Sequence, residues 1–215
     1  FMIYKREQIA DNIGYTAIVD KKFKTDVLSV KFITDLCPET NAENSIAVGT
    51  LATSNMKYKT LAELTSKLAS LYGSSVYADV KKRGDIQVLS VGASWLDNAY
   101  ALENEDITSE MLEIVSDCIF RPNADGESFD EASFNIRKND LLDKIDAEIN
   151  NKRGYAVSQA FETAFRGEPA EYSCYGKRAQ AEASTSASAY KAYLELLKNA
   201  QIEIFFVSPQ ENKSV

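Results

Sequence analysis

Histidine is absent from all 215 residues of this sequence. Imidazole is the general base of serine and cysteine catalytic triads and the commonest nitrogen ligand of zinc in proteins. The chain therefore cannot build a histidine triad, a histidine-paired cysteine or a histidine-ligated zinc site from its own residues. Of all the residue counts, this absence is the most informative about function.

Cysteine is scarce, and its three positions, Cys37, Cys118 and Cys174, are far apart with no C-x-x-C pair. An odd number of widely spaced cysteines argues against a disulfide framework or a thiolate zinc site and fits a reducing compartment. No apolar run approaches the roughly 18 residues of a membrane-spanning helix. The first residues, FMIYKREQ, lack the apolar region of a signal peptide. We therefore expect no membrane insertion and a cytoplasmic location.

Basic charge is not in excess, since 24 Lys and Arg stand against 32 Asp and Glu. Nucleic-acid binding needs clustered basic side chains that neutralise phosphates, so nucleic acid is not an expected partner. The phosphate-binding patterns G-x-G-x-x-G and Walker A are also missing, and we expect no cofactor. The basic run Lys81–Asp85 fits a solvated hairpin turn, and the carboxylates from Asp140 to Glu148 fit a solvent-facing helix stripe.

The stretch from Ser45 to Trp95 carries the clearest structural signals in the chain. Small and apolar residues at 45–53 predict a short buried helix. Thr60 and Glu63 form the T-x-x-E pattern of a capping box at the start of a second helix. Alternating residues then predict two strands joined by a turn. We expect four side chains to be buried between the second helix and the sheet: Leu64, Leu68, Leu89 and Val91.

The remaining patterns place further strands and helices around this stretch. They predict strands at 15–19, 27–33 and 202–207, and helices near 108–121, 128–149, 155–165 and 190–197. We expect Thr108 or Ser109 to cap the first of these helices, and Ser128 with Glu131 to form a second capping box. Residues 1–14, 41–44 and 170–188 are predicted to lie outside regular structure. The order indicates an α+β fold, an antiparallel or mixed sheet with helices packed on one face, as a single domain over 1–208.

The order short helix, K-Y-x-T, capped helix ending L-Y-G, strand, turn and strand resembles the N-terminal half of the M16 (pitrilysin-like, inverzincin) metallopeptidases. Active members carry H-x-x-E-H on the short helix, where two histidines bind zinc and the glutamate is the general base. Aligning Lys57, Tyr58 and Thr60 places Ser45 and Gly49 at the two histidines of the motif and Val48 at its glutamate. None of the three keeps the chemistry of the motif.

The family's third zinc ligand is a glutamate on a later helix, in a pattern that ends E-E-I or Q-E-I. The matching run here is Leu141–Ile145, which places Lys144 at the ligand position. An ammonium group has no lone pair to donate and repels a metal ion. The resemblance therefore implies a non-catalytic bacterial member without a zinc site, with Ser45, Val48, Gly49 and Lys144 as its degenerate motif positions.

The resemblance also implies a partner. Families of this kind pair an active chain that carries H-x-x-E-H with an inactive one, and the two enclose a peptide or small protein as a heterodimer. The polar residues 209–215 would then begin a linker to a second, similar half. Two alternatives remain open: an assembly whose zinc site comes from another subunit, and a purely structural subunit of a larger complex.

The residues around Arg153–Ala156 and Tyr175–Gly176 resemble a segment of non-catalytic members and are interpreted as packing and turn residues, possible parts of an inner chamber wall.

Overall fold

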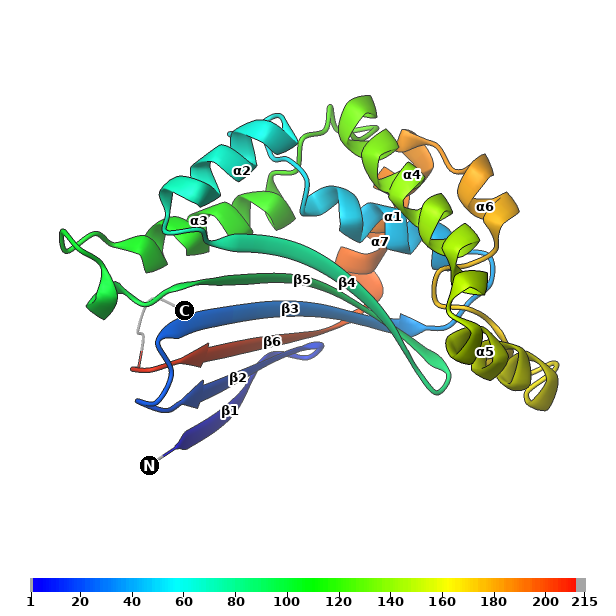
Figure 1. Cartoon of the computed structure of the whole chain (residues 1–215), viewed down its shortest axis with the longest axis horizontal. Coiled ribbons are helices and arrows are strands. Elements are labelled where there is room, and N and C mark those ends of the chain that lie inside the picture. The colour runs from blue at the N-terminus through cyan, green and yellow to red at the C-terminus, as the bar shows by residue number, and fades with distance from the viewer. Residues whose placement is uncertain (1, 212–215) are drawn as a thin grey trace.

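The computed structural model describes residues 2–211 and contains one mixed six-stranded sheet covered by helices (Figure 1). The strand order across the sheet is β1-β2-β6-β3-β5-β4. β2 and β6 are parallel, and the other neighbours are antiparallel. The strands are β1 (Ile3–Ala10), β2 (Ile13–Val19), β3 (Thr25–Asp35), β4 (Ser75–Arg83), β5 (Ile86–Leu96) and β6 (Gln201–Ser208). The predicted α+β fold is confirmed, and the sheet is of the mixed kind.

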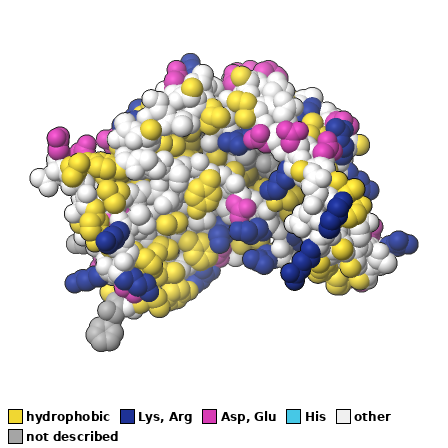
Figure 2. All heavy atoms as spheres, viewed as in Figure 1, with side chains coloured by type: hydrophobic (Ala, Val, Ile, Leu, Met, Phe, Trp, Pro, Cys, Tyr) yellow, Lys and Arg dark blue, Asp and Glu magenta, His cyan; other side chains and the backbone are white. Residues whose placement is uncertain are grey.

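Six of the helices lie on one face of this sheet, and α5 projects beside the β4–β5 hairpin (Figure 1). Lys and Arg side chains border the recess between the sheet and α5 on the face that Figure 2 shows. The helices are α1 (Asn41–Leu51), α2 (Leu61–Ser70), α3 (Ile107–Phe120), α4 (Glu131–Ala147), α5 (Lys152–Ala164), α6 (Arg178–Ala183) and α7 (Ser186–Asn199), with short 3₁₀ turns at Asn98–Tyr100, Glu148–Asn150 and Pro169–Glu171. Among residues 2–211, no helix is both long enough and apolar enough to cross a membrane.

The core lies between the sheet and the helices because alternate strand residues point to that face. Leu64, Leu89 and Val91 are fully buried, and Leu68 is 8% exposed. Their predicted burial is therefore confirmed. Trp95 is also buried, and its indole N–H donates a hydrogen bond of 3.0 Å to the Thr108 hydroxyl.

The caps follow the sequence prediction at one helix and depart from it at two. At α2, both bonds of the Thr60–Glu63 capping box are present. At α3 the N-cap is Asp106 rather than Thr108 or Ser109, and its carboxylate accepts from the Ser109 N–H. At α4 the N-cap is Asp130 instead of Ser128, whose N–H and hydroxyl turn to Asp125. The observed cap lies two residues before Thr108 at α3 and two residues after Ser128 at α4. At both helices an aspartate caps in place of the hydroxyl residue, because a charged acceptor makes the stronger hydrogen bond.

Three segments predicted to be irregular are ordered. Residues 3–10 form the edge strand β1, which the pattern missed because all its side chains are exposed and show no alternation of burial. The polar residues 41–44 are the first turn of α1, since Asn41 and Asn44 are buried and hydrogen-bonded inside the protein. Residues 170–188 contain α6 and the start of α7. The predicted linker at 209–215 lies mostly outside the described residues.

Candidate functional site

Helix α1 packs against two strands and three other helices and carries three of the four positions that the sequence alignment predicts to match the zinc motif. Every residue of α1 except Glu43 is buried. The helix contacts β4, β5, α4, α6 and α7. Because Ser45, Val48 and Gly49 are spaced three and four residues apart, they share one side of the helix. The three positions therefore lie together on α1, in the interior of the protein.

Ser45 belongs to a buried polar network that joins α1 to the sheet and to the segment before α6. Its hydroxyl lies 2.7 Å from the Asn41 carbonyl oxygen and 3.1 Å from the Cys174 carbonyl oxygen. Gln87 of β5 donates to the same Cys174 carbonyl at 2.6 Å, and Asn44 donates to the Gln87 side-chain oxygen at 3.0 Å. These bonds satisfy polar groups that would otherwise be costly to bury. Ser45 therefore has a structural role here.

Gly49 is covered by Arg137 of α4. A Cβ atom at Gly49 would lie 3.3 Å from Arg137 Cγ and 3.4 Å from its Cβ and Cδ. The Arg137 guanidinium extends past this contact, donating to the Thr53 hydroxyl at 2.6 Å and forming an ion pair with Asp140 at 2.9 Å. The aliphatic stem of Arg137 thus packs where a side chain at position 49 would project.

Lys144 lies further along α4, and its ammonium is 4.2 Å from the centroid of the Tyr175 ring. This is cation–π distance, and the contact keeps the charge at the protein surface. Sequence reasoning predicted neither Arg137 over Gly49 nor Tyr175 under Lys144, because both contacts join elements distant in the chain. The assignment of Lys144 to the third ligand position stays a prediction.

The residues at this site do not fit a zinc ion. Val48 and Gly49 offer no donor atom, the Ser45 hydroxyl is engaged in the network, and Arg137 brings a positive charge to the same side of α1. Within residues 2–211 there is no group of three or more His, Cys, Asp or Glu side chains that could hold a metal.

The two buried thiols are also unsuited to chemistry. Burial raises the pKa of Cys118 and of Cys174 to about 11. A thiol is a nucleophile only as the thiolate, so both are protonated and inert near neutral pH. Neither buried thiol therefore provides a nucleophile near neutral pH.

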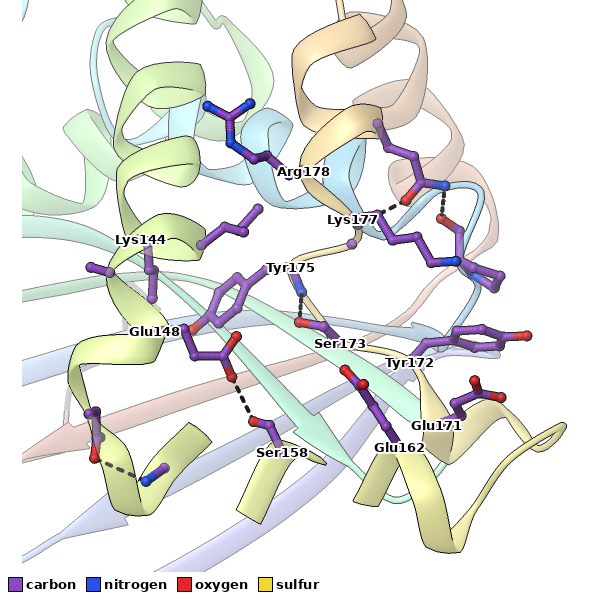
Figure 3. Close-up of a pocket in the computed structure, with 17 residues that line it drawn as sticks. Lys144, Glu148, Ser158, Glu162, Glu171, Tyr172, Ser173, Tyr175, Lys177 and Arg178 are labelled. Carbon is purple, nitrogen blue, oxygen red and sulfur yellow. Dashed lines mark hydrogen bonds between the residues drawn. The ribbon is translucent and has the colours of Figure 1, made fainter. Parts of the chain in front are cut away.

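A pocket of about 660 Å³ lies beside α1, between the C-terminal part of α4, α5 and the segment 171–180 (Figure 3). It joins the degenerate motif through the segment 173–175, since Ser45 contacts the Cys174 carbonyl while Ser173 and Tyr175 line the pocket. Tyr175 lines this pocket, and its place in the wall of an inner chamber stays a prediction. The rest of the pocket was missed because residues 170–180 have no helical or strand periodicity.

Gly176 explains how this wall approaches α1 so closely. It has a φ of +72°, and a Cβ there would lie 2.8 Å from the Ala42 backbone nitrogen and Cβ. Only glycine accepts both the left-handed backbone and the contact. The prediction that Tyr175–Gly176 serves packing and a turn agrees with this geometry.

No family model matches the sequence. The chain is similar over its whole length to a protein of Bacillus subtilis (strain 168) called "Probable inactive metalloprotease YmfF", with 23% identity over 216 residues. The match covers 51% of that protein, so the chain spans about half the length of this relative.

Solved structures give the same picture of the fold. A conserved protein from Enterococcus faecalis V583 superposes with a TM-score of 0.89 and 23% identity, over 99% of this chain and 50% of that one. A peptidase M16 inactive domain from Pseudomonas fluorescens has a TM-score of 0.71 and 12% identity, over 97% of this chain and 47% of that one. At these identities the likeness concerns the fold, and each neighbour is about twice as long as the match.

Proposed function

Since this chain is an M16-like, non-catalytic half, we propose that it is the inactive partner of an active M16 subunit that carries H-x-x-E-H. Together the two would hold a peptide or small protein. The observation that carries the proposal is the state of α1: the helix is fully formed and buried in an M16-like fold, yet Ser45, Val48 and Gly49 provide no zinc ligand.

The half-length coverage of its relatives supports the need for a second unit. The match covers about half of the Bacillus and Enterococcus proteins. A unit of this size would present its binding surface to a second half or subunit, and the catalytic residues would come from that other chain. In this arrangement the assembly, and not this chain, hydrolyses the peptide.

Two features support a peptide as the ligand. The pocket of Figure 3 is lined by the segment 171–178, which also contacts α1 at Ser45 and Ala42, and α1 is where the active family has its reaction centre. In addition, β4 is an edge strand that, among residues 2–211, pairs with β5 alone, and α1 packs against both strands. An extended peptide can add to such an edge through main-chain hydrogen bonds. We therefore place the peptide along this side of α1.

Co-expression with an H-x-x-E-H homologue encoded in the same genome tests the proposal. The expected result is a stable complex by size-exclusion chromatography and analytical ultracentrifugation. Hydrolysis of a quenched fluorescent peptide library should be at least several-fold faster for the complex than for either chain alone.

The matched control replaces the glutamate of the partner's H-x-x-E-H motif by glutamine, which should abolish hydrolysis and leave the complex intact. No complex with any such homologue, or equal hydrolysis with and without this chain, would overturn the proposal. A complex without any gain in hydrolysis would favour the purely structural alternative.

A further inference from the structure

The pocket beside α1 is lined by charges that remain free to meet a ligand. Lys144, Lys177, Glu148, Glu162 and Glu171 all line it, and none of them takes part in an ion pair among residues 2–211. Arg178 also lines the pocket, but it forms ion pairs with Asp146 at 2.8 Å and with Glu182. The pocket thus combines unpaired groups of both signs.

The two signs are separated in space. In Figure 3 the carboxylates of Glu148, Glu162 and Glu171 lie below the Tyr175 ring, whereas Lys144 and Lys177 lie at its level or above. The acidic side comes from the end of α4, from α5 and from the turn at 169–171. The basic side comes from α4 and the start of α6. A ligand that spans the pocket therefore meets negative charge at one end and positive charge at the other.

Several of these groups are held in place by neutral partners. Ser158 donates to the Glu148 carboxylate at 2.6 Å, and the Gly167 N–H donates to Glu171 at 2.7 Å. The Lys144 ammonium rests on the Tyr175 ring. Hydrogen bonds of this kind orient a charge without neutralising it, and this lowers the conformational cost of binding.

The wall between the two sides is rigid. Lys82 donates to the Tyr172 carbonyl at 3.0 Å and also to the Ala170 carbonyl, and Asn41 donates to the Ser173 carbonyl at 3.0 Å. The Cys174 carbonyl is bound by Gln87. The segment 170–174 is thereby anchored from the sheet and from α1, with the Tyr172 and Tyr175 side chains in the pocket lining.

We propose that this pocket binds a peptide segment that carries a basic and an acidic side chain close together. The basic side chain lies on the side of Glu162 and Glu171, and the acidic one on the side of Lys144 and Lys177. This inference deepens the proposed function and rests on it for the choice of a peptide as ligand. A phosphate or nucleotide would meet three carboxylates, and a bare cation would meet the lysines, so a ligand with both charges fits best.

The size and surface of the pocket agree with this ligand. A volume of about 660 Å³ lies within the usual range of about 300–1,000 Å³ for small-ligand sites. The Tyr172 and Tyr175 rings offer flat surfaces on which a lysine stem or an arginine guanidinium can pack.

Fluorescence anisotropy with capped heptapeptides tests the inference. The parent probe is an alanine-rich peptide with one arginine and one glutamate two residues apart. In three further probes, glutamine replaces the arginine, the glutamate, or both. The doubly charged peptide should bind about 3–10-fold more tightly than the doubly neutral one, the range expected for two exposed ion pairs. This preference should shrink in 0.5 M salt because of screening.

Matched variants assign the two ends. Glu162→Gln with Glu171→Gln should remove the preference for arginine and keep the preference for glutamate. Lys144→Gln with Lys177→Gln should remove the preference for glutamate and keep the preference for arginine. Asp143→Asn with Glu168→Gln changes the net charge by the same amount as the first pair, at exposed residues outside the pocket lining, and should leave both preferences unchanged.

Three results would overturn the inference: no binding of any probe, equal binding of all four probes, or an equal effect of the control pair and the pocket pair. Failure of the proposed function is distinguishable, because the pocket variants should still form the complex with the H-x-x-E-H chain. Selective peptide binding without a complex would refute the partner role and leave the pocket assignment standing. A complex whose pocket shows no charge selectivity would refute the pocket assignment and leave the partner role standing.

Discussion

At the scale of single residues, Asp26 is a buried carboxyl group whose burial alters its pKa. It lies on β3, is 1% exposed, and accepts a hydrogen bond of 3.1 Å from Thr108. Burial raises the pKa of Asp26 above its ordinary value, more than its hydrogen bonds lower it. The folded protein therefore binds this proton more tightly than the unfolded chain does.

The pH dependence of stability follows from this difference. Between the ordinary pKa of an aspartate and the raised value, the folded state holds more protons, so the free energy of unfolding falls as pH rises. We expect Asp26→Asn to lose this part of the pH dependence in urea titrations between pH 3.5 and pH 7. Asp11→Asn, at an exposed turn residue, serves as control and should keep the wild-type slope. Equal slopes for the wild type and Asp26→Asn would contradict the assignment.

Thiol reactivity is a second property of single residues. Cys37 is partly exposed, whereas Cys118 and Cys174 are buried with pKa values raised to about 11. Because the thiolate is the reactive form, we expect one thiol per chain to react with iodoacetamide at pH 8 in the native protein, and three in urea. Peptide mass mapping should place the native label on Cys37. Rapid native labelling of Cys174 would mean that the segment 170–176 opens readily.

At the scale of elements, the packing of α2 on the sheet gives a direct test of stability. Leu68 faces the core and is 8% exposed, whereas Leu61 on the same helix is 37% exposed. Leu68→Ala should lower the free energy of unfolding by about 2–5 kcal/mol through lost burial and a residual cavity. Leu61→Ala should change it by only about 0.5 kcal/mol. Denaturant titration of both variants measures the difference, and similar losses would mean that α2 is turned the other way.

The pairing of α1 with α4 allows the predicted zinc positions to be tested together. Ser45→His, Gly49→His and Lys144→Glu would supply two imidazoles and a carboxylate, the ligand set of an active member. Arg137→Ala must accompany them, because the Arg137 stem lies within 3.4 Å of a Cβ at position 49. Val48 is left unchanged, since a glutamate there would bury a charge that zinc binding does not need.

We expect the fourfold variant to retain about one zinc per chain after dialysis. The same variant with Lys144 kept should retain none, and neither should the wild type. Metal analysis together with circular dichroism, to confirm folding, decides the outcome. A folded fourfold variant without zinc would show that the alignment over 45–49 or at 144 is wrong.

The elements also show how far the sequence alone reaches. Patterns with strong periodicity or a short-range cap, such as α2, the β4–β5 hairpin and β6, were predicted close to their observed bounds. β1 was missed because an edge strand exposed on both faces has no burial pattern. The contact of Arg137 with Gly49 and the polar network around Ser45 and Gln87 join residues more than 40 positions apart, and nothing in the local sequence signals them.

At the scale of the whole molecule, the two ends of the sequence are tied together through the sheet. Arg6 of β1 and Glu203 of β6 form a two-pronged ion pair with both N–O distances at 2.7 Å, on either side of Gly14 in β2. A Cβ at Gly14 would lie 2.7 Å from the Glu203 carboxylate, so glycine leaves the room for this bond. The Arg6 guanidinium holds the pKa of Glu203 below its usual range.

β6 comes after the other five strands of this sheet along the chain, yet it lies in the middle of the sheet, between β2 and β3. While the ribosome is still translating α7, the first hairpin has no neighbour to pair with, and β3 has one open side. Since long-range strand pairing forms slowly and leaves open edges prone to association, this chain must wait for residues 201–208 before its sheet can close. A nascent chain stalled before Gln201 should therefore bind chaperones and be cut readily by protease. One stalled some 40 residues beyond Ser208, with β6 clear of the ribosomal tunnel, should resist both.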